Sequence, residues 1–430
     1  MEKDSLLEAF FEMPRWEAAI NKGLLKDIDK GVLARLCSPD GRAEMCEQIE
    51  NGTYEIQPPH TAKIPKDDPG EFRTVYVNEP KDRVLLAIAN DLLFERMHKF
   101  IHPRCMSYLK GVGCGNVVKE ASERVVKAKG KWIGFKADLS KYFDSVPIEY
   151  IDKAFDDVEA HCGKSKLIDV IRRYYHDDTY WNSEDKCTEH LFQSLKQGCS
   201  VAAYLADVIL YHIDDRLSSM GGFYVRYSDD ILYIGENFQD AHALLEWELG
   251  QMRMKLNPKK VEFLRKDKWF RFLGFAIRGK DISLSAPRLK QFQHEIEWRS
   301  TKCRNLWRAE NKEAAGREAT RRIVRFLYKG DGRHSWATSV LPVVNVRRDV
   351  DEMSKFVMDC IRGIYTGKRR TGGLGYDPDG EVGVVLRGRG QNVSNNRRKV
   401  GKIEGFYTLG AMQNAMLSSR SAYQALCAAM

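Results

Sequence analysis

The stretch Phe223-Tyr-Val-Arg-Tyr-Ser-Asp-Asp-Ile-Leu-Tyr-Ile-Gly235 decides the fold. Two short runs rich in Val, Ile and Tyr meet at a polar tip, Ser228-Asp229-Asp230, a pattern that predicts a β-hairpin. Such a hairpin would hold two carboxylates at one exposed sheet edge, where their repulsion is costly unless cations neutralise it. Mg²⁺ prefers one or two carboxylates together with phosphate oxygens. Taken alone, an Asp-Asp pair is more often a plain β-turn, so a metal site needs a third carboxylate elsewhere.

Asp138 is the candidate third carboxylate. Ile133, Phe135 and Ala137 alternate as in a strand that ends at Asp138, and the next residues predict a helix capped by Ser140. Asp138 would then lie where a buried strand reaches the surface, although it could equally cap the helix. Phe143 follows five residues later. It could cover the sugar of an incoming nucleotide and exclude a 2′-hydroxyl, or it could simply pack in the core.

The composition is that of an ordered globular protein. The chain has 430 residues, is 43% hydrophobic and 10% aromatic, and no apolar run approaches the length of a membrane span. Its first residues are charged and contain no apolar signal core. The ten cysteines form no Cys-x-x-Cys motif, which argues against a zinc site and a disulfide framework. We therefore expect reduced thiols, a cytoplasmic location and no membrane association.

Basic residues are concentrated in two stretches, 285–330 and 363–402, where Lys and Arg alternate with aromatic residues or glycines. Such stretches favour binding to a polyanion with bases that can stack, and hence to nucleic acid. The alternative for each stretch is a solvated helix face.

Positive charge also marks residues 54–77, which read as extended segments broken by prolines. Pro69-Gly70 is a turn signal, so Lys66 and Arg73 are expected on adjacent strands of one hairpin. Two cations on a hairpin could hold a triphosphate, with Arg binding phosphate bidentately. Exposed cations on hairpins are common, however, and the pair alone decides nothing.

Gln197-Gly-Cys-Ser200 is the next informative motif, followed by a helix expected to reach Ile213. Gly198 would allow a close approach of backbone to ligand. Gln197 could then contact the base or sugar of a nucleotide.

Periodicity predicts most of the remaining elements. Helices are expected over 1–50 and 80–100, and a turn is expected at Gly111–Gly115. Further helices are expected over 164–180, 241–254, 287–328, 349–365 and 409–430, with a short hairpin over 270–277 and extended residues around Pro342.

These motifs, in this order, resemble those of reverse transcriptases. Tyr227-Ser-Asp-Asp230 resembles the Tyr-x-Asp-Asp box of that family, and Ala137-Asp-Leu-Ser-Lys-Tyr-Phe-Asp144 resembles its first metal motif. The remaining matches are Ile64-Pro-Lys66 with Arg73 in the fingers, Gln197-Gly-x-Ser200 at the template and nucleotide, Lys260 in the lysine loop, and Phe272-Leu-Gly-Phe275 at the primer grip.

The resemblance implies an α+β right-hand polymerase fold, with fingers and palm joined to a mainly helical, basic thumb and C-terminal region. It implies two Mg²⁺ ions, with Mn²⁺ as a substitute, bound by Asp138, Asp229 and the carbonyl of Leu139, with Asp230 completing the catalytic carboxylates. It further implies Lys260 as the proton donor to pyrophosphate. Triphosphate contacts fall to Lys66 and Arg73, sugar selection to Phe143, nucleotide contacts to Gln197 and Gly198, and primer contacts to Phe272, Leu273 and Gly274.

Domain limits follow from the same comparison. The expected parts are an N-terminal helical extension (1–50), fingers (51–130), palm (131–280, with a fingers insertion at about 150–200), thumb (281–330) and an RNA-binding C-terminal region (331–430).

Within the family, the motifs are similar to those of bacterial enzymes from group II introns, retrons and diversity-generating elements. Ala276-Ile-Arg-Gly replaces the Val-Thr-Gly of retrons, and Gln197-Gly replaces the Leu-Gly of diversity-generating enzymes. Stretches after Leu341 and Leu374 resemble phage-defence reverse transcriptases of type 2. That resemblance implies a dedicated structured non-coding RNA as template, DNA as product, and RNA binding by the C-terminal arginines Arg387, Arg389, Arg397 and Arg398.

Two other functions remain open on the same palm. An RNA-dependent RNA polymerase shares the fold, but Phe143 argues against it because a small residue would admit ribose. An inactive RNA-binding maturase or structural module would be expected to have lost acids, whereas Asp138, Asp229 and Asp230 are all present.

Overall fold

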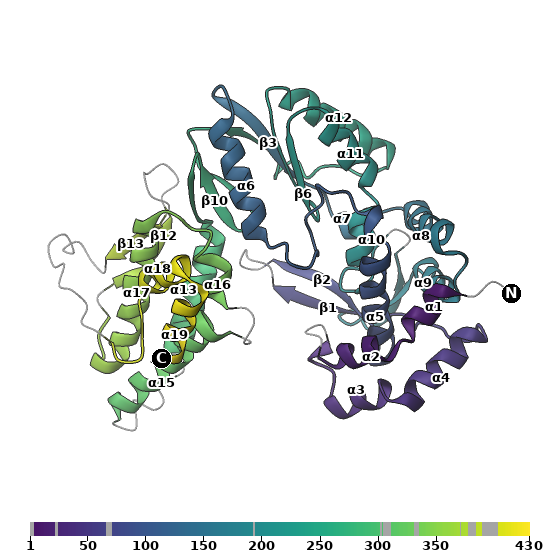
Figure 1. The fold of residues 1–430 in the computed structure, drawn as a ribbon, viewed down its shortest axis with the longest axis horizontal. Coiled ribbons are helices and arrows are strands. Elements are labelled where there is room, and N and C mark those ends of the chain that lie inside the picture. Colours follow the sequence, from purple (N-terminus) through teal and green to yellow (C-terminus); the bar gives the residue numbers. More distant parts are fainter. Residues whose placement is uncertain are drawn as a thin grey trace. The chain divides into compact units, whose positions relative to one another are not determined.

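The computed structural model describes residues 4–21, 25–65, 71–191, 194–301, 303, 311–330, 335–369, 371–376, 384–388 and 403–430. The chain forms two compact units (Figure 1). Unit 1 comprises Met1–Gly111 and Gly134–Glu262, and unit 2 comprises Val112–Ile133 and Phe263–Met430. No helix of the described residues is long and apolar enough to cross a membrane.

Unit 1 begins with four short helices, which confirms the helical N-terminal prediction. They are α1 (Ser5–Phe10), α2 (Met13–Ile20), α3 (Lys30–Leu36) and α4 (Pro39–Glu50). Side chains of Asp4, Asp29 and Ser38 accept hydrogen bonds from first-turn N–H groups and so fix three of the helix starts. Helices α1 to α3 pack around α5 (Pro80–Arg96), which is apolar on most sides and deeply buried and leads into the short 3₁₀ helix η2 (His98–Phe100).

The first sheet of unit 1 has the strand order β2-β1-β4-β5. Its strands are β1 (His60–Pro65), β2 (Phe72–Val77), β4 (Thr179–Asn182) and β5 (Cys187–His190). Strands β1 and β2 are antiparallel, with Ile64 opposite Arg73, so the predicted hairpin is confirmed. Lys66 and the predicted turn Pro69-Gly70 lie outside the described residues.

The second sheet carries the Asp-Asp motif and has the order β6-β7-β3-β8. Its strands are β3 (Trp132–Asp138), β6 (Phe223–Tyr227), β7 (Asp230–Ile234) and β8 (Glu262–Arg265); the division between the units falls within β3 and β8. Side chains of β6 and β7 are buried almost throughout. Helices α11 (Tyr211–Ser219) and α12 (Phe238–Gln251) pack on β6 and β7 (Figure 1).

The helices between β3 and β6 differ in part from the predictions. Besides α11 they are α7 (Tyr142–Ser145), α8 (Ile148–Cys162), α9 (Lys166–His176) and α10 (Ala202–Val208), of which α8 was not predicted. The predicted cap at Ser140 is wrong, because α7 begins at Tyr142 and the residue that precedes it, Lys141, has a left-handed backbone. The prediction over 164–180 is too long, since the chain turns extended for β4. The helix expected to reach Ile213 is broken into α10 and α11.

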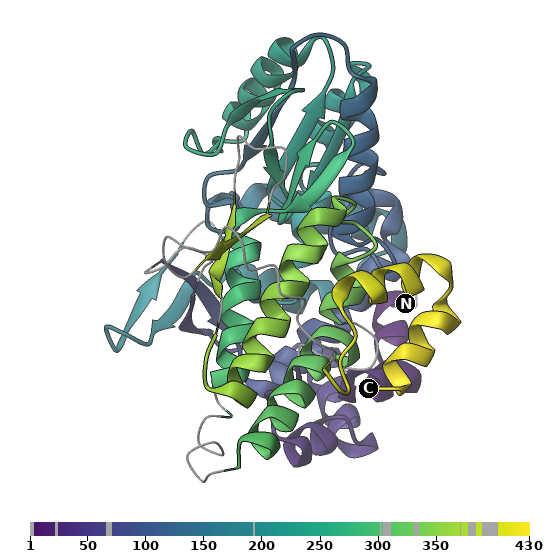
Figure 2. The ribbon, with the colours of Figure 1, turned by 90° about the vertical axis from the view of Figure 1, so that its left-hand side faces the viewer.

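Unit 2 contains a helix, a small sheet and a helical bundle. Helix α6 (Cys114–Lys127) packs on a sheet of order β11-β10-β9, formed by β9 (Phe270–Phe272), β10 (Phe275–Arg278) and β11 (Asp281–Leu284). The bundle contains α13 (Ala286–Thr301), α15 (Lys312–Val324), the π-helical turn η3 (Arg325–Lys329), α16 (Trp336–Val340) and α17 (Arg347–Thr366). Helices α13, α15 and α17 run side by side (Figure 2).

The end of unit 2 adds a hairpin and two helices. Strands β12 (Thr371–Tyr376) and β13 (Val384–Gly388) pair with each other, and α18 (Leu409–Ser418) and α19 (Arg420–Ala428) follow. The sequence predictions missed α16, β11 and the β12–β13 hairpin, and they placed a turn where α6 begins. Arg389, Arg397 and Arg398 lie outside the described residues, and Arg387 is a residue of β13.

Candidate active site

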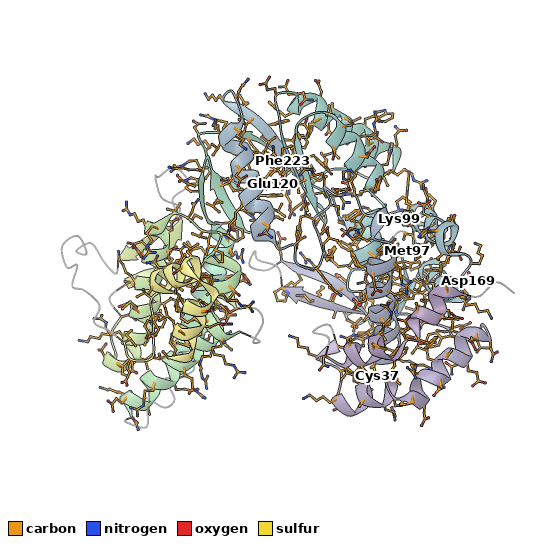
Figure 3. All side chains as sticks on the ribbon, in the orientation of Figure 1. Cys37, Met97, Lys99, Glu120, Asp169 and Phe223 are labelled. Carbon is orange, nitrogen blue, oxygen red and sulfur yellow. The ribbon has the colours of Figure 1, made fainter. Side chains whose placement is uncertain are left out.

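The β6–β7 hairpin has a two-residue loop, Ser228-Asp229, between Tyr227 and Asp230, which face each other across the ladder. Phe223, labelled in Figure 3, begins the hairpin. Ser228 has φ +58°, a left-handed conformation that costs energy for any residue other than glycine. A strained backbone at the loop persists only where surrounding contacts determine it.

A buried polar network holds that loop. The backbone N–H of Ser228 donates to the hydroxyl of Ser107 at 2.9 Å, and the Arg226 guanidinium donates to the Ser228 carbonyl at 3.1 Å. Arg226 also forms a fully buried ion pair with Asp214, at 2.6 Å. Tyr224 donates its hydroxyl to the same carboxylate at 2.7 Å. The strands and the loop are therefore fixed from behind by charges that are fully paired.

The third carboxylate is brought to the hairpin by the sheet register. Asp138 and Asp230 are direct partners across the β3–β7 ladder. The N–H of Leu139 donates to the carbonyl of Asp229 at 3.3 Å, so β3 ends beside the loop. Asp138, Asp229 and Asp230 thus lie together, as the sequence predicted for a palm.

Cations surround these carboxylates without neutralising them fully. The ammonium group of Lys260 lies 2.7 Å from Oδ2 of Asp138, on a loop whose Asn257 N–H donates to the Asp138 carbonyl at 2.8 Å. Burial, followed by the Asp229 and Asp138 charges, raises the pKa of Asp230 to about 6. Burial and Asp138 also raise the pKa of Asp229, whereas Lys260 and Arg73 lower it. Lys260 and Arg73, which the sequence motifs singled out, are therefore close enough for their charges to act on Asp229.

The donor set fits a divalent cation. Carboxylate and carbonyl oxygens are the hard ligands that Mg²⁺ prefers, and a cation would offset the burial and the repulsion that together raise the two pKa values. Within the described part of the chain, no group of three or more His, Cys, Asp or Glu side chains is arranged to hold a metal by itself. Because Mg²⁺ is usually bound by one or two carboxylates plus substrate phosphates, this arrangement is compatible with such a site.

Phe143 and the Gln197-Gly198 motif flank this region in unit 1. Phe143 is half-buried and packs against the core, with its ring 5.6 Å from that of Tyr142. The carbonyl of Gln197 accepts a hydrogen bond from the Tyr76 N–H at 2.7 Å. Gly198 has φ +111°, and a Cβ there would lie 2.7 Å from the Tyr76 carbonyl. Gly198 therefore lies close to the backbone of strand β2, whereas the sequence predicted a close approach to a ligand.

The primer-grip motif forms a separate turn in unit 2. Phe272 is buried at the end of β9, and Leu273 and Gly274 both have positive φ, at 48° and 77°. The Gly274 carbonyl accepts a hydrogen bond from the N–H of Ser285 at 3.1 Å. The hairpin over 270–277 is confirmed.

Sequence reasoning missed the supporting residues, although they left a signal. Arg226 is a charge within a strand of buried residues, and Asp207 lies within the apolar helix α10. A lone charge in a buried segment requires a buried partner, because an unpaired charge is very costly there. Ser107 completes the network with a 2.5 Å hydrogen bond to Asp207.

Comparison with known proteins identifies the domain. Residues 64–277 match the family described as "Reverse transcriptase (RNA-dependent DNA polymerase)". These residues form a reverse transcriptase domain. It is the catalytic domain of RNA-directed DNA polymerases, which use divalent metal ions, and its α+β right-hand fold is the predicted one. None of the curated proteins compared with the chain matches it.

Solved telomerases are similar to parts of this chain. Apo telomerase from Candida tropicalis is 13% identical, with a TM-score of 0.45, over 73% of this chain and 58% of the telomerase chain. Telomerase from Candida albicans, in complex with a TWJ fragment of telomeric RNA, is 11% identical, with a TM-score of 0.41, over 74% of this chain and 61% of its own. This chain thus spans about three fifths of the length of either telomerase chain.

Proposed function

We propose that the protein adds dNTPs to a DNA or RNA 3′ end on an RNA template, by two-metal catalysis. The observation that carries this proposal is the pairing of Asp138 with Asp230 across the β3–β7 ladder, with Asp229 in the adjoining loop. Bound divalent ions would activate the 3′-hydroxyl and stabilise the leaving pyrophosphate. Asp138, Asp229 and the carbonyl of Leu139 would hold two Mg²⁺, and Asp230 would complete the charge.

The surrounding residues would position the nucleotide. Arg73 is exposed on β2, close enough to lower the pKa of Asp229, and would hold the triphosphate together with Lys66. Lys260, whose side chain is 57% exposed, would release Asp138 and donate a proton to pyrophosphate. Gln197 would contact the nucleotide, with Gly198 keeping its loop against β2.

We assign domain roles along the chain as the sequence motifs indicate. Residues 1–50 would be an extension, 51–130 the fingers, 131–280 the palm with an insertion at about 150–200, 281–330 the thumb, and 331–430 an RNA-binding region. The compact units group the chain differently, since Val112–Ile133 belongs to unit 2. The primer-grip turn at Phe272, Leu273 and Gly274 would contact the primer.

The template would be a structured non-coding RNA, and the setting would be antiphage defence in a bacterial cytoplasm. This part rests on the likeness of the C-terminal stretches to type 2 phage-defence enzymes. Arginines among glycines suit contacts to phosphates and unpaired bases. Arg387, Arg389, Arg397 and Arg398 are the candidates.

Primer extension tests the chemistry. Asp229→Ala with Asp230→Ala should abolish dNTP incorporation on an RNA template while the protein stays folded, because the two carboxylates are costly to keep charged in the folded state and their loss does not weaken it. Asp240→Asn, at an exposed site on α12, is the matched control and should retain full activity. Incorporation by the folded double variant would refute the assignment.

The same assay separates the two alternatives. An RNA-dependent RNA polymerase would extend with NTPs in preference to dNTPs. A maturase or structural module would bind RNA and extend with neither.

The RNA proposal needs its own experiment. RNA and DNA that co-purify with the full chain should be sequenced, and a single structured RNA with its complementary DNA is expected. Changing all four candidate arginines to Gln should weaken binding of that RNA, with a log–log salt slope reduced by roughly 0.7–0.9 per lost contact. Extension of a short pre-annealed primer–template should be spared; equal losses on both would indicate a general duplex grip.

Phage challenge tests the biological setting. Phage should form fewer plaques on cells that carry the wild-type gene than on cells that carry the gene with Asp229→Ala and Asp230→Ala. Equal plaque counts would remove the defence proposal while leaving the polymerase proposal intact.

A further inference from the structure

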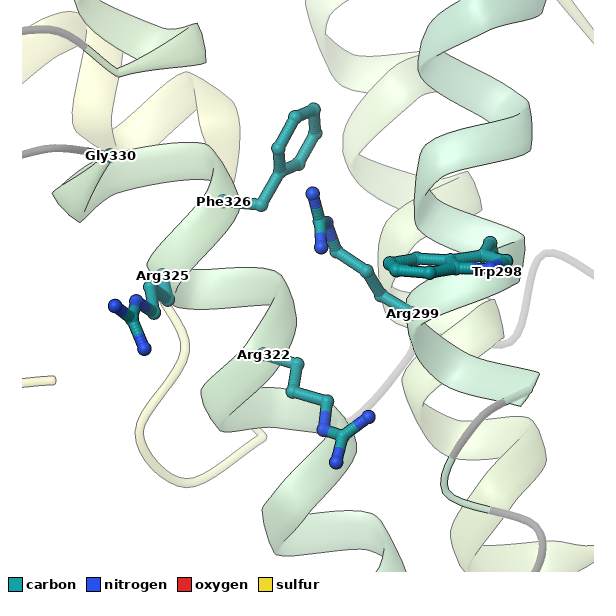
Figure 4. A pocket seen from close by; sticks show the side chains of 6 residues that line it. All are labelled: Trp298, Arg299, Arg322, Arg325, Phe326 and Gly330. Atoms are coloured by element: carbon teal, nitrogen blue, oxygen red, sulfur yellow. The ribbon is translucent and has the colours of Figure 1, made fainter. Parts of the chain in front are cut away.

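A basic and aromatic pocket lies within the helical bundle of unit 2 (Figure 4). Its volume is about 470 Å³, which is in the range of small-molecule sites. The residues that line it are Trp298 and Arg299 of α13, Arg322 of α15, Arg325 and Phe326 of η3, and Gly330.

The pocket is bounded by a π-helical turn, a feature that occurs often at functional sites. Gly330 ends this turn with φ +53° and donates its N–H to the Arg325 carbonyl at 2.8 Å. Arg325 and Phe326 both line the pocket from this turn, and their side chains leave it in different directions (Figure 4). Arg325 is exposed, and no ion pair to it is found among the residues that the structure describes.

Arg299 lies at the centre. Its guanidinium is 4.5 Å from the ring centroid of Phe326 and 5.2 Å from that of Trp298, and Arg299 and Phe326 point toward each other in Figure 4. An ion pair with Glu295, at 2.9 Å, satisfies one end of the group. Its Nε is buried and has no hydrogen-bond partner within the described parts of the chain.

The other two arginines differ in how they are paired. Arg322 donates to Glu318 at 2.6 Å, so its charge is largely compensated. Arg325 can accept an anion without breaking an ion pair of the described structure. The pocket therefore offers one available guanidinium beside two that are fixed in place, a setting suited to phosphate.

The aromatic part of the pocket selects the kind of anion. Trp298 is 43% exposed, so part of its indole is accessible to a ligand. Base–aromatic stacking is a main source of affinity for single strands. Inside a duplex the base faces are stacked on one another, so only an unpaired nucleotide can present a free face and a phosphate together.

We propose that this pocket binds one unpaired nucleotide, with the base against Trp298 and the phosphate on Arg325. The inference rests on the proposed function for the presence of nucleic acid, and it adds a single-strand site distinct from any grip on the primer–template duplex. The nucleotide would come from a strand, RNA or DNA, or be free in solution; the chemistry is the same.

Binding by the full chain tests the proposal. Fluorescence anisotropy should be measured with a 12-nucleotide oligouridylate RNA and with a blunt 12-base-pair RNA–DNA duplex. Trp298→Ala and Arg325→Gln should each raise the Kd for the single strand about 10-fold, a size typical of one lost stacking or charge contact. The Kd for the duplex should change less than about 2-fold.

Two variants control for the type of change. Trp247→Ala removes another exposed tryptophan, on α12, and Arg317→Gln removes another exposed arginine, on α15. Both should bind the single strand as the wild type does. Melting temperatures of Arg325→Gln and of the two controls should match the wild type because their side chains are exposed, and Trp298→Ala, which also loses its contact with Arg299, should still melt cooperatively.

Competitors distinguish the ligand sources. Displacement of the oligonucleotide by micromolar uridine monophosphate would assign the pocket to free nucleotides, and displacement only at millimolar levels would assign it to a strand. Equal displacement by a polyglutamate peptide would overturn the proposal in favour of an acidic protein partner.

Two further outcomes would overturn it: unchanged single-strand binding in both pocket variants, or equal weakening for single strand and duplex. Extension of a pre-annealed primer–template keeps the two proposals apart. If the wild type and both pocket variants extend the primer equally, the polymerase proposal stands, whether or not the pocket binds a nucleotide. Absence of extension by the wild type would count against the polymerase alone.

Discussion

Two groups of charged residues at the β6–β7 hairpin differ in how their charges are compensated: those at its tip, and those at its base behind the loop. At the base, Arg226 and Asp214 are both completely buried, and each is paired and hydrogen-bonded. At the tip, Asp229 and Asp230 are half-buried beside Asp138, and their pKa values are raised because burial and mutual repulsion disfavour their charges. Charge that is satisfied within the protein supports the structure, whereas charge left unsatisfied is available to a ligand.

Removing one carboxylate at the tip of the hairpin should change the rate of dNTP incorporation, and this is the largest effect that we expect. We expect Asp230→Asn to lower dNTP incorporation on the order of 10²–10³-fold or more, since a charge at the reacting centre is lost. In EDTA at pH 8 the same variant should be more stable than the wild type by about 1–2 kcal/mol, because the raised pKa makes the charged form costly. Extension kinetics and urea denaturation check the two halves. A variant that is both active and less stable would contradict the comparison.

Removing the buried Arg226–Asp214 ion pair at the base of the hairpin should mainly lower the free energy of unfolding. Arg226→Met leaves Asp214 buried without its cation, which should lower the free energy of unfolding by about 3–5 kcal/mol. Arg226→Met combined with Asp214→Leu should recover part of that loss, since no charge is left unpaired. The control is Arg265→Met, at a surface pair with Asp267, which should cost far less stability than Arg226→Met because solvent screens the pair. Urea denaturation decides, and equal losses for Arg226→Met and Arg265→Met would contradict the prediction.

Lys196 extends the comparison to a buried cation next to Gln197. Its ammonium donates to the carbonyls of Tyr174 and Asp177, and burial lowers its pKa to about 8. Between pH 8 and about 10.4 the unfolded chain therefore binds more protons than the folded chain, so stability rises with pH there. The expected gain is about 3 kcal/mol, and it should be absent in Lys196→Met. Urea denaturation across that pH range measures it, and identical slopes in both proteins would contradict the shift.

Substitution of Phe143 should change the choice between dNTP and NTP, and this is the smallest effect that we expect. If its ring closes the site beneath the sugar, Phe143→Ala should reduce the preference for dNTP over NTP about 10-fold, while much dNTP activity remains. Single-nucleotide extension with each substrate gives the ratio. A folded variant with an unchanged ratio would mean that Phe143 is a core residue and that sugar selection lies elsewhere.

Local sequence patterns predicted strands β3, β6 and β7 well, because apolar runs on both sides of the Asp-Asp pair favour a hairpin over a plain turn. The order of the motifs predicted that Asp138 joins Asp229 and Asp230, but the register that pairs Asp138 with Asp230 was seen only in the structure. Long-range partners could not be predicted: Ser107 reaches Ser228 across more than a hundred residues, and no local pattern encodes that contact. Helix breaks were missed for the same reason, since the division between α10 and α11 lies inside one apolar stretch.

The roles proposed for individual residues of the candidate site also depend on partners that are distant in the sequence, and they remain predictions. Gly198 shows why: its type was predicted to matter for close approach, but the neighbour it approaches is the Tyr76 backbone, from a distant part of the chain. The Trp298–Arg325 pocket likewise combines α13 with a π-helical turn that no helical pattern would distinguish from an ordinary helix.

The position of α6 in the chain has a consequence for synthesis on the ribosome. Its buried face, Val117, Val118, Ala121 and Val125, packs on β10 and β11, and Ser122 donates to the Gly279 carbonyl at 2.9 Å. Those strands emerge about 150 residues after α6, which at roughly 5–20 residues per second is a delay of roughly 8–30 s. During that time an apolar helix surface must stay uncovered or be protected by a chaperone. A nascent chain stopped at residue 262 should therefore aggregate more readily than one released at residue 430.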